Sequence, residues 1–259
     1  MSDSFPFKSA LVTGASSGIG EAMVELLAEQ DIPTVVVARR RDRLDELAAR
    51  HSCVTVLAAD LTDPNGLREV LARVADTANP LDLVVNNAGF GSSGLFSEVD
   101  ADRLDAEVQL NVAALTSISR AALGAMVPRG RGYLLNVSSV AGFQAAPKFA
   151  VYAATKAYVT SLSESLHEEV RGTGVHVTAL CPGFTHTEFQ SVNNTEGYTS
   201  RYPGFVWLEA DDVARAGLVD VAKGKTLSIP GGLYKGLVAT VGFLPRSLVR
   251  RASSIVQRD

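Results

Sequence analysis

Tyr152 and Lys156 form the first pair in this sequence whose residue types and spacing suggest chemistry. They stand four residues apart in a run that is typical of the start of a helix. Residues at this spacing share one helix face, so the ammonium group can act on the phenol. A free tyrosine titrates near ~10, and a nearby positive charge favours the phenolate, so we expect a lowered pKa for Tyr152. Such a tyrosine can exchange a proton with a substrate oxygen. A surface pair with this spacing by accident is the alternative.

A glycine-rich loop, Gly14–Gly20, follows the first apolar run of the chain, Lys8–Thr13. Its glycines are spaced GxxxGxG, and a helical apolar pattern begins at Ile19. A strand, a glycine loop and a helix N-terminus together form a phosphate site, because bare backbone and free N–H groups meet the anion there. An ordinary tight turn is the alternative for the loop taken alone.

Three arginines, Arg39, Arg40 and Arg41, follow the second predicted strand, Thr34–Ala38. An acidic residue at this point would bind the ribose 2′-hydroxyl of NAD, whereas arginine accommodates the 2′-phosphate of NADP. The first acid is Asp42, which lies inside the next predicted helix. A solvated helix start is the alternative, but three cations there oppose the helix dipole. We therefore predict NADP(H) as the cofactor, with Arg39 and Arg40 as phosphate ligands.

Apolar runs typical of strands alternate with helical patterns along the chain. Further strands are predicted at 53–59, 81–85 and 133–137, and helices are predicted from 63, over 101–127 and from 152 to about 171. This alternation favours a parallel sheet covered by helices on both faces. With 259 residues, of which 46% are hydrophobic and 20% charged, the chain can bury a large core. We expect one domain over residues 1–259.

The composition argues against several classes of protein. The net charge is −4 and the isoelectric point is near 5.6, so no nucleic-acid partner is expected. Cys53 and Cys181 lie in apolar runs without a CxxC or Cys/His cluster, so neither a metal nor a disulfide is expected. The first eight residues lack the apolar core of a signal peptide, and no apolar run is expected to span a bilayer. We predict a cytoplasmic protein.

Several further polar residues complete a recognisable set in fixed order. These are Asp60, Asn86–Gly89, Asn111, Ser139 and the segment Pro182–Thr187. With the glycine loop and the Tyr152/Lys156 pair, they resemble the short-chain dehydrogenase/reductase family over about residues 8–232. The resemblance implies a Rossmann-type, doubly wound parallel sheet of about seven strands in the order 3-2-1-4-5-6-7. It also implies a homodimer or homotetramer, although residues 233–259 exceed the length of many members and put the tetramer in doubt.

The resemblance also implies a role for each catalytic side chain. Tyr152 would be the general acid in ketone reduction and the general base in alcohol oxidation. Lys156 would lower the pKa of Tyr152 and hold the nicotinamide ribose. Ser139 would bind the substrate oxygen, with Ser138 as the alternative hydroxyl, and Asn111 would serve a water relay.

Cofactor contacts are implied for the glycine loop, the ends of the following strands, the catalytic pair and the segment after the sixth strand. The expected cofactor-binding residues are Gly14, Ser16, Ser17, Gly18, Ile19, Gly20, Arg39, Arg40, Asp60, Leu61, Asn87, Ala88, Gly89, Tyr152, Lys156, Pro182, Gly183, Thr185 and Thr187. Among these, Asp60 would hold the adenine ring, Asn87 the adjacent ribose and Thr185 the carboxamide.

Two segments near the C-terminus have open interpretations. Residues 184–209 carry many aromatic side chains and few helix signals, which indicates a lid over an apolar pocket for a hydrophobic carbonyl or alcohol. A lid that only packs on the sheet is the alternative. Within it, His186 either touches substrate or is satisfied by its own loop. Residues 233–259 mix apolar and basic side chains, which suits packing on the same chain, a cover for the substrate mouth, a dimer contact or a membrane-surface helix.

Two functions compete at this point. The first is an NADP(H)-dependent oxidoreductase that interconverts a ketone or aldehyde with its alcohol. The second is a non-catalytic nucleotide-binding module that acts in regulation, or in recruitment to a partner or a membrane surface. Loss of a catalytic residue would favour the second, and Asn111, Ser139, Tyr152 and Lys156 are all present.

Overall fold

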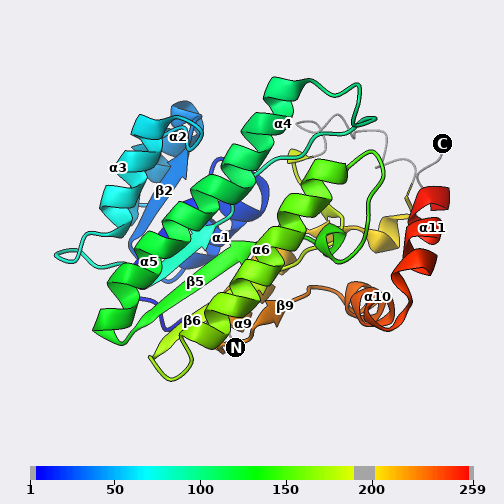
Figure 1. Cartoon of the computed structure of the whole chain (residues 1–259). Helices are drawn as coiled ribbons and strands as arrows, with labels where there is room; N and C mark the ends of the chain where they lie inside the picture. The colour runs from blue at the N-terminus through cyan, green and yellow to red at the C-terminus, as the bar shows by residue number, and fades with distance from the viewer. Residues whose placement is uncertain (1–3, 190–201, 257–259) are drawn as a thin grey trace.

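Seven parallel strands form the central sheet of the computed structural model, which describes residues 4–189 and 202–256 (Figure 1). The strands are β1 (Ala10–Thr13), β2 (Thr34–Ala38), β3 (Val54–Ala58), β4 (Leu83–Asn86), β5 (Gly132–Val137), β6 (Val175–Leu180) and β9 (Leu227–Ser228). Their order is β3-β2-β1-β4-β5-β6-β9, which confirms the predicted topology. A separate parallel pair, β7 (Thr185–His186) and β8 (Leu208–Glu209), lies in the predicted lid.

The strand order reverses at β1, which pairs with β2 on one side and β4 on the other. Ala10 is in register with Thr34 of β2 and with Leu83 of β4. All four residues of β1 and of β4 are buried, as expected for strands that helices cover on both faces. In such sheets ligands bind outside the carboxyl ends of the strands at the reversal point. The fold therefore directs attention to the loops that follow β1 and β4.

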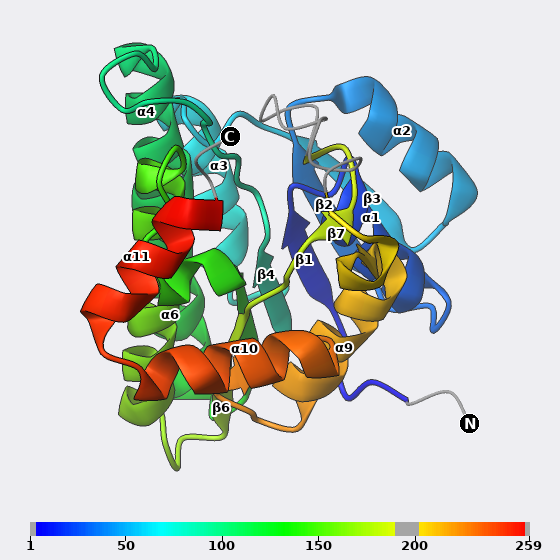
Figure 2. The same ribbon diagram turned by 90° about the vertical axis from the view of Figure 1, so that its right-hand side faces the viewer.

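Helices form a layer on each face of the sheet (Figure 2). One layer contains α1 (Gly18–Ala28), α2 (Arg41–Arg50) and α9 (Ala210–Ala222), and the other contains α3 (Pro64–Val74), α4 (Ala101–Val108), α5 (Leu115–Arg129) and α6 (Ala150–Glu169). Met23 and Leu218 are buried in the first interface, and Ile118 and Met126 in the second. Two apolar cores, one on each face, thus hold the sheet.

Local signals in the sequence explain where several helices begin. Asp63 caps α3 by accepting a hydrogen bond from the Gly66 N–H at 3.0 Å, and Pro64 occupies the first turn, as predicted. Asp100 caps α4 in the same way, accepting from the Arg103 N–H at 2.9 Å. Between α4 and α5 the chain forms a π-helical segment, η1 (Gln109–Ala114). Such segments are rare and occur frequently at functional sites.

The continuous helical stretch Ala101–Arg129 is long and apolar enough to cross a membrane by length and composition alone. Its most apolar 18-residue window has a mean hydropathy of 1.4. By length and composition alone, this stretch is an exception to the expectation that no apolar run can span a bilayer. In the structure the stretch packs on the sheet, with Ile118, Ala122 and Met126 fully buried, as a core helix of a globular protein does.

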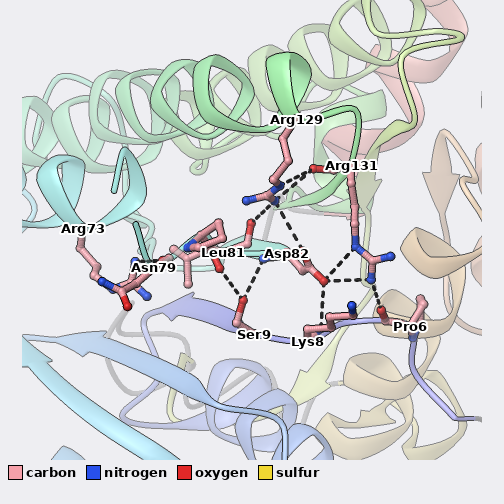
Figure 3. Close-up of polar contacts among 10 residues, drawn as sticks. Pro6, Lys8, Ser9, Arg73, Asn79, Leu81, Asp82, Arg129 and Arg131 are labelled. Atoms are coloured by element: carbon pink, nitrogen blue, oxygen red, sulfur yellow. Dashed lines mark hydrogen bonds and ion pairs between the residues drawn. The ribbon is translucent and has the colours of Figure 1, made fainter. Parts of the chain in front are cut away.

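An ionic cluster around Asp82 lies near the amino ends of the central strands (Figure 3). Asp82 is 6% exposed, and its Oδ2 accepts hydrogen bonds from the Lys8 N–H at 3.0 Å and from Arg131 Nη2 at 2.9 Å and Nε at 3.1 Å. Arg129 Nη2 lies 3.5 Å from Oδ1 and donates to the Leu81 carbonyl at 2.6 Å. The cluster ties the amino-terminal segment and the α5–β5 connection to the start of β4.

The chain beyond β9 folds into two helices, α10 (Gly232–Phe243) and α11 (Arg246–Val256). Tyr234 of α10 is buried, and its hydroxyl accepts from the Phe184 N–H at 3.0 Å and donates to the Val206 carbonyl at 2.6 Å. The tail therefore packs on its own chain, against the two ends of the lid. The alternatives of a dimer contact and a membrane-surface helix stay predictions.

Candidate active site

A cavity of about 1150 Å³ opens at the carboxyl ends of the central strands. It extends from the glycine loop and Arg40 at one end to Tyr152 and the lid aromatics at the other. Every residue that the sequence predicted for catalysis or cofactor binding lines this cavity, except Gly20 and Asn111. Asn111 is buried behind it. The structure thus brings together residues from loops and helices that are far apart in the sequence.

Tyr152 and Lys156 both belong to α6 and face the cavity from one side of that helix. The Lys156 ammonium lies 5.7 Å from the centre of the Tyr152 ring and donates a hydrogen bond to the Val137 carbonyl at 2.9 Å. Ser139 follows the end of β5, in extended backbone, and its hydroxyl is near enough to the Tyr152 phenol to favour the phenolate. Two side chains that carry hydroxyl groups therefore line the same cavity.

Burial dominates the acid–base properties of this pair. It raises the pKa of Tyr152 to about 12, because protein atoms around the ring disfavour the phenolate more than the Ser139 hydroxyl favours it. Burial also lowers the pKa of Lys156 to about 8. The prediction of a lowered pKa for Tyr152 is therefore wrong. The phenol is protonated at neutral pH, which is the form that a general acid requires.

The structure separates the two adjacent serines after β5. Ser138 is buried and donates to the Lys156 carbonyl at 2.7 Å, and its hydroxyl also lies 2.7 Å from that of Thr160. Ser138 thus holds α6 against β5. The Ser139 hydroxyl accepts from the Ala141 N–H at 3.1 Å and is the one beside Tyr152. This geometry favours Ser139 as the serine that meets a substrate oxygen.

Asn111 lies in the π-helical segment η1 and is 1% exposed. Its Oδ1 accepts from the Phe90 N–H at 3.2 Å, and its Nδ2 donates to the Phe90 carbonyl at 2.7 Å and to Thr155 Oγ1 at 3.2 Å. Asn111 therefore clamps the loop after β4 onto η1 and α6. It supports the site from behind, and the predicted part in a water relay stays a prediction.

The glycine loop is held by the Asn86–Gly89 segment across the reversal point. Gly14 has a φ of 65°, and a β-carbon there would lie 2.8 Å from the Ala88 Cα, so only glycine fits. The Asn87 side chain donates to the Thr13 carbonyl at 3.0 Å and to the Gly14 carbonyl at 3.1 Å. Asn87 thus fixes the loop itself, and its predicted contact with a ribose is a separate expectation.

Arg40 is the arginine that reaches the glycine loop. Its guanidinium donates to Ser16 Oγ at 3.0 Å and to Ser17 Oγ at 2.9 Å, and it pairs with Glu188 Oε2 at 2.8 Å. Arg39 also lines the cavity and is exposed. A guanidinium, two hydroxyls and a glycine loop at a helix start form a donor set that fits a phosphate group. Glu188, which the sequence reasoning missed, accepts a hydrogen bond from the Arg40 guanidinium, and this hydrogen bond lowers the pKa of Glu188.

The remaining predicted cofactor contacts lie along the same wall. Asp60 Oδ1 accepts from the Thr62 N–H at 2.9 Å and from its hydroxyl at 2.7 Å, which holds the turn after β3. Leu61 is buried beside it. Thr185 is buried in β7 and donates to the Gly183 carbonyl at 3.0 Å, while the Thr187 methyl group packs over the loop at Gly18.

Aromatic side chains form the other end of the cavity. The Phe189 ring lies 5.5 Å from Tyr152, and Phe184 stacks on Tyr202 at 4.8 Å and contacts Trp207 at 5.2 Å. Leu237 and Tyr234 of the tail also line it. The described aromatic residues of the segment thus line one end of the cavity, and a lid over an apolar pocket stays a prediction. Tyr198 and its neighbours at 190–201 lie outside the described residues.

His186 does not line the cavity. It is exposed, and its ring stacks on Trp207 with centres 4.8 Å apart. This placement agrees with a histidine satisfied by its own loop rather than one in contact with substrate.

Comparisons with known proteins agree with this geometry. A family model described as short chain dehydrogenase matches residues 8–197. An uncharacterized oxidoreductase of Staphylococcus aureus (strain MRSA252) is 32% identical over 224 residues, which cover 86% of this chain and 94% of that protein.

Two solved structures are similar over nearly the whole chain. A short-chain dehydrogenase from Sphingobium yanoikuyae in complex with NADPH is 32% identical, with a TM-score of 0.81 and coverage of 92% of this chain and 97% of that one. A bulky-bulky ketone specific alcohol dehydrogenase from Comamonas testosteroni is 30% identical, with a TM-score of 0.76 and coverage of 93% and 96%. The chain therefore belongs to the short-chain dehydrogenase family and is an oxidoreductase.

Proposed function

We propose that this protein is an NADP(H)-dependent oxidoreductase that interconverts a ketone or aldehyde with its alcohol on a hydrophobic substrate. One observation carries the proposal: Tyr152, Ser139 and Lys156 face the same cavity as the glycine loop and Arg40. A proton donor, an oxygen ligand and a phosphate-type donor set therefore share one enclosed space. Metal ligands are not required for this chemistry.

The nicotinamide ring, when bound, supplies a hydride to the carbonyl carbon or accepts one from the alcohol. Tyr152 gives its phenolic proton to the substrate oxygen in reduction and takes it back in oxidation, a transfer that contributes roughly 10²–10⁴ in rate. Ser139 donates a second hydrogen bond to the same oxygen, and loss of one such donor typically costs about 10²–10³. Lys156 places a positive charge beside the phenol, which favours release of the proton.

The preference for NADP(H) is supported by the surroundings of the loop after β2. Arg40 contacts Ser16 and Ser17, Arg39 lies next to it, and no acidic residue stands between β2 and α2. A relative that is 32% identical binds NADPH. The residues present thus fit a 2′-phosphate at the adenosine end of the cavity.

The substrate class is supported by the walls of the cavity. Phe184, Phe189, Tyr202, Trp207 and Leu237 surround the space next to Tyr152 with apolar surface. A relative that is 30% identical is specific for ketones with two bulky groups. We propose a ketone, or the matching secondary alcohol, with large apolar substituents.

The test is NADPH oxidation against a panel of bulky aryl and alicyclic ketones. Tyr152→Phe should lower kcat/KM by about 10²–10⁴ on any accepted ketone. Tyr158→Phe is the matched control, because Tyr158 lies on the same helix and its exposed hydroxyl lies 2.9 Å from Thr116 Oγ1, its one hydrogen-bond partner among the described residues. Equal activity of wild type and Tyr152→Phe would refute the mechanism.

Cofactor preference and the competing function are read from the same protein sample. NADPH should raise the thermal midpoint of unfolding more than NADH at equal concentration, because only NADPH carries the 2′-phosphate that Arg40 would bind. Tight nucleotide binding without turnover of any ketone or alcohol would instead point to a non-catalytic module. A homodimer or homotetramer in the cytoplasm is the assembly and location that we propose, and gel filtration measures the assembly.

A further inference from the structure

Glu107 is a buried carboxyl group that the mechanism above does not use. It lies on α4 one helical turn before Asn111 and is 0% exposed. Neither of its oxygens makes a hydrogen bond of normal geometry to any described residue, and the same is true of the buried Ser92 hydroxyl. Buried carboxylates are rare unless they are paired, so a group in this state calls for a physical reason.

The loop after β4 lies between Glu107 and the catalytic side chains. A β-carbon placed on Gly89 would lie 3.4 Å from Lys156 Nζ, and one placed on Gly91 would lie 2.9 Å from the Tyr152 ring. The next residue, Ser92, lies near the Glu107 carboxyl and lowers its pKa. Glu107 therefore lies on the far side of a thin layer of backbone from Tyr152 and Lys156, where α4 packs against α6.

Among the described residues, the groups whose charge acts on Glu107 or Lys156 can be named. Glu107 faces Arg103 on its own helix and Lys156 on α6. Lys156 faces Glu107 and the Cys181 thiol, which follows β6. The charge of Glu107 also acts on Tyr152. Burial raises the pKa of Glu107, while Ser92, Arg103 and Lys156 lower it.

We propose that Glu107 is a positioning residue for catalysis: a buried countercharge that keeps Lys156 protonated and so sets the pH range in which Tyr152 delivers its proton. This inference rests on the proposed function. It assigns Glu107 no contact with substrate or cofactor. Its effect is electrostatic, and it acts through the low-dielectric layer that separates Glu107 from the two catalytic groups.

The expected direction follows from the sign of each interaction. The Glu107 carboxylate raises the pKa of Lys156 and the pKa of Tyr152. Without it, Lys156 loses its proton at lower pH, and Tyr152 does so as well. Both changes move the alkaline fall of the reduction rate to lower pH, by about one pH unit for a charge interaction of typical size.

The main experiment is the pH profile of kcat/KM for NADPH-dependent ketone reduction by Glu107→Gln, which keeps the shape and removes the charge. We expect the fall of kcat/KM on the alkaline side of the profile, its alkaline limb, to occur about one pH unit lower than in wild type. Glu107→Asp, which keeps the charge, should restore the wild-type limb. The matched control is Asp105→Asn, which removes an exposed carboxylate from the same helix and should leave the limb in place. A uniform loss of rate in Glu107→Gln without a shift would overturn the proposal.

Thermal unfolding provides a readout that does not depend on turnover. The folded-state pKa of Glu107 is raised, so its contribution to stability is fully present below the unfolded value of about 4.3 and is lost as pH rises through the folded value. The thermal midpoint of Glu107→Gln should therefore rise relative to that of wild type as the pH increases above the unfolded pKa of glutamate. A difference that is constant with pH would overturn the proposal. Absence of any turnover by wild type would refute the proposed function instead.

Discussion

The hydroxyl of Tyr234 is expected to hold the lid to the rest of the molecule. It bonds at once to the Phe184 N–H at 3.0 Å and to the Val206 carbonyl at 2.6 Å, which belong to the two ends of the lid. The Tyr234 ring also lies directly on Gly183, where a β-carbon would come within 2.0 Å of a ring carbon. Replacement by phenylalanine keeps the ring packing and removes only the two hydrogen bonds.

The size of the effect follows from the groups that are left without partners. Each partly buried backbone group that loses its partner costs about 1–3 kcal/mol, less where solvent reaches it. We therefore expect Tyr234→Phe to lower the free energy of unfolding by about 2 kcal/mol. For a chain of this size, about 1 kcal/mol corresponds to a shift of roughly 2–4 °C in the melting temperature. The expected decrease is about 4–8 °C.

The assay is thermal unfolding followed by circular dichroism, together with the KM for an accepted ketone, which should rise because Phe184, which lines the cavity, is held less firmly. Tyr158→Phe is the matched control, since it removes one exposed hydroxyl and should change the midpoint by about 1 °C or less. Equal midpoints for Tyr234→Phe and Tyr158→Phe would refute the reasoning, because they would show that the two lid contacts add no stability.

Three further predictions concern charges. Asp82→Asn should lower the free energy of unfolding by about 1.5–3 kcal/mol, measured with urea, because the buried Asp82 carboxylate loses its charge-assisted hydrogen bonds from the half-exposed Arg131; a loss below about 1 kcal/mol would contradict this. Glu188→Gln should strengthen NADPH binding about two- to fivefold by calorimetry, because it frees Arg40, and leave NADH binding unchanged; equal gains for both would contradict it. For wild type, the reduction rate should fall above about pH 8 as Lys156 loses its proton, and a profile flat to pH 10 would contradict this.

The sheet and the location of the site could be predicted because they depend on local patterns. The run Thr34–Ala38 is a strand with the predicted bounds, and Asp63 caps α3 as its spacing with Pro64 indicated. Loops after parallel strands meet at one edge, so Arg40 and Ser139 had to lie along the same edge of the sheet once the strand order was known.

The features that could not be predicted depend on packing between distant segments. The pKa of Tyr152 is set by burial from all sides, and only its spacing from Lys156 is visible in the sequence. Tyr234 lies in a tail without a family pattern, and its contacts with the lid exist only in three dimensions. Glu107 reads in the sequence as one of several acids on the polar side of a helix, yet α4 turns it into the core.

The position of Trp207 gives this protein an intrinsic optical probe. It is the single tryptophan of the chain, it is 8% exposed, and it lines the cavity. Its ring contacts those of Phe184 and His186. Indole emission depends on the polarity around the ring, so a ligand that fills the apolar end of the cavity should change its wavelength or intensity. Binding of unlabelled ketones and alcohols could therefore be titrated by fluorescence, including in Tyr152→Phe, where turnover no longer reports it.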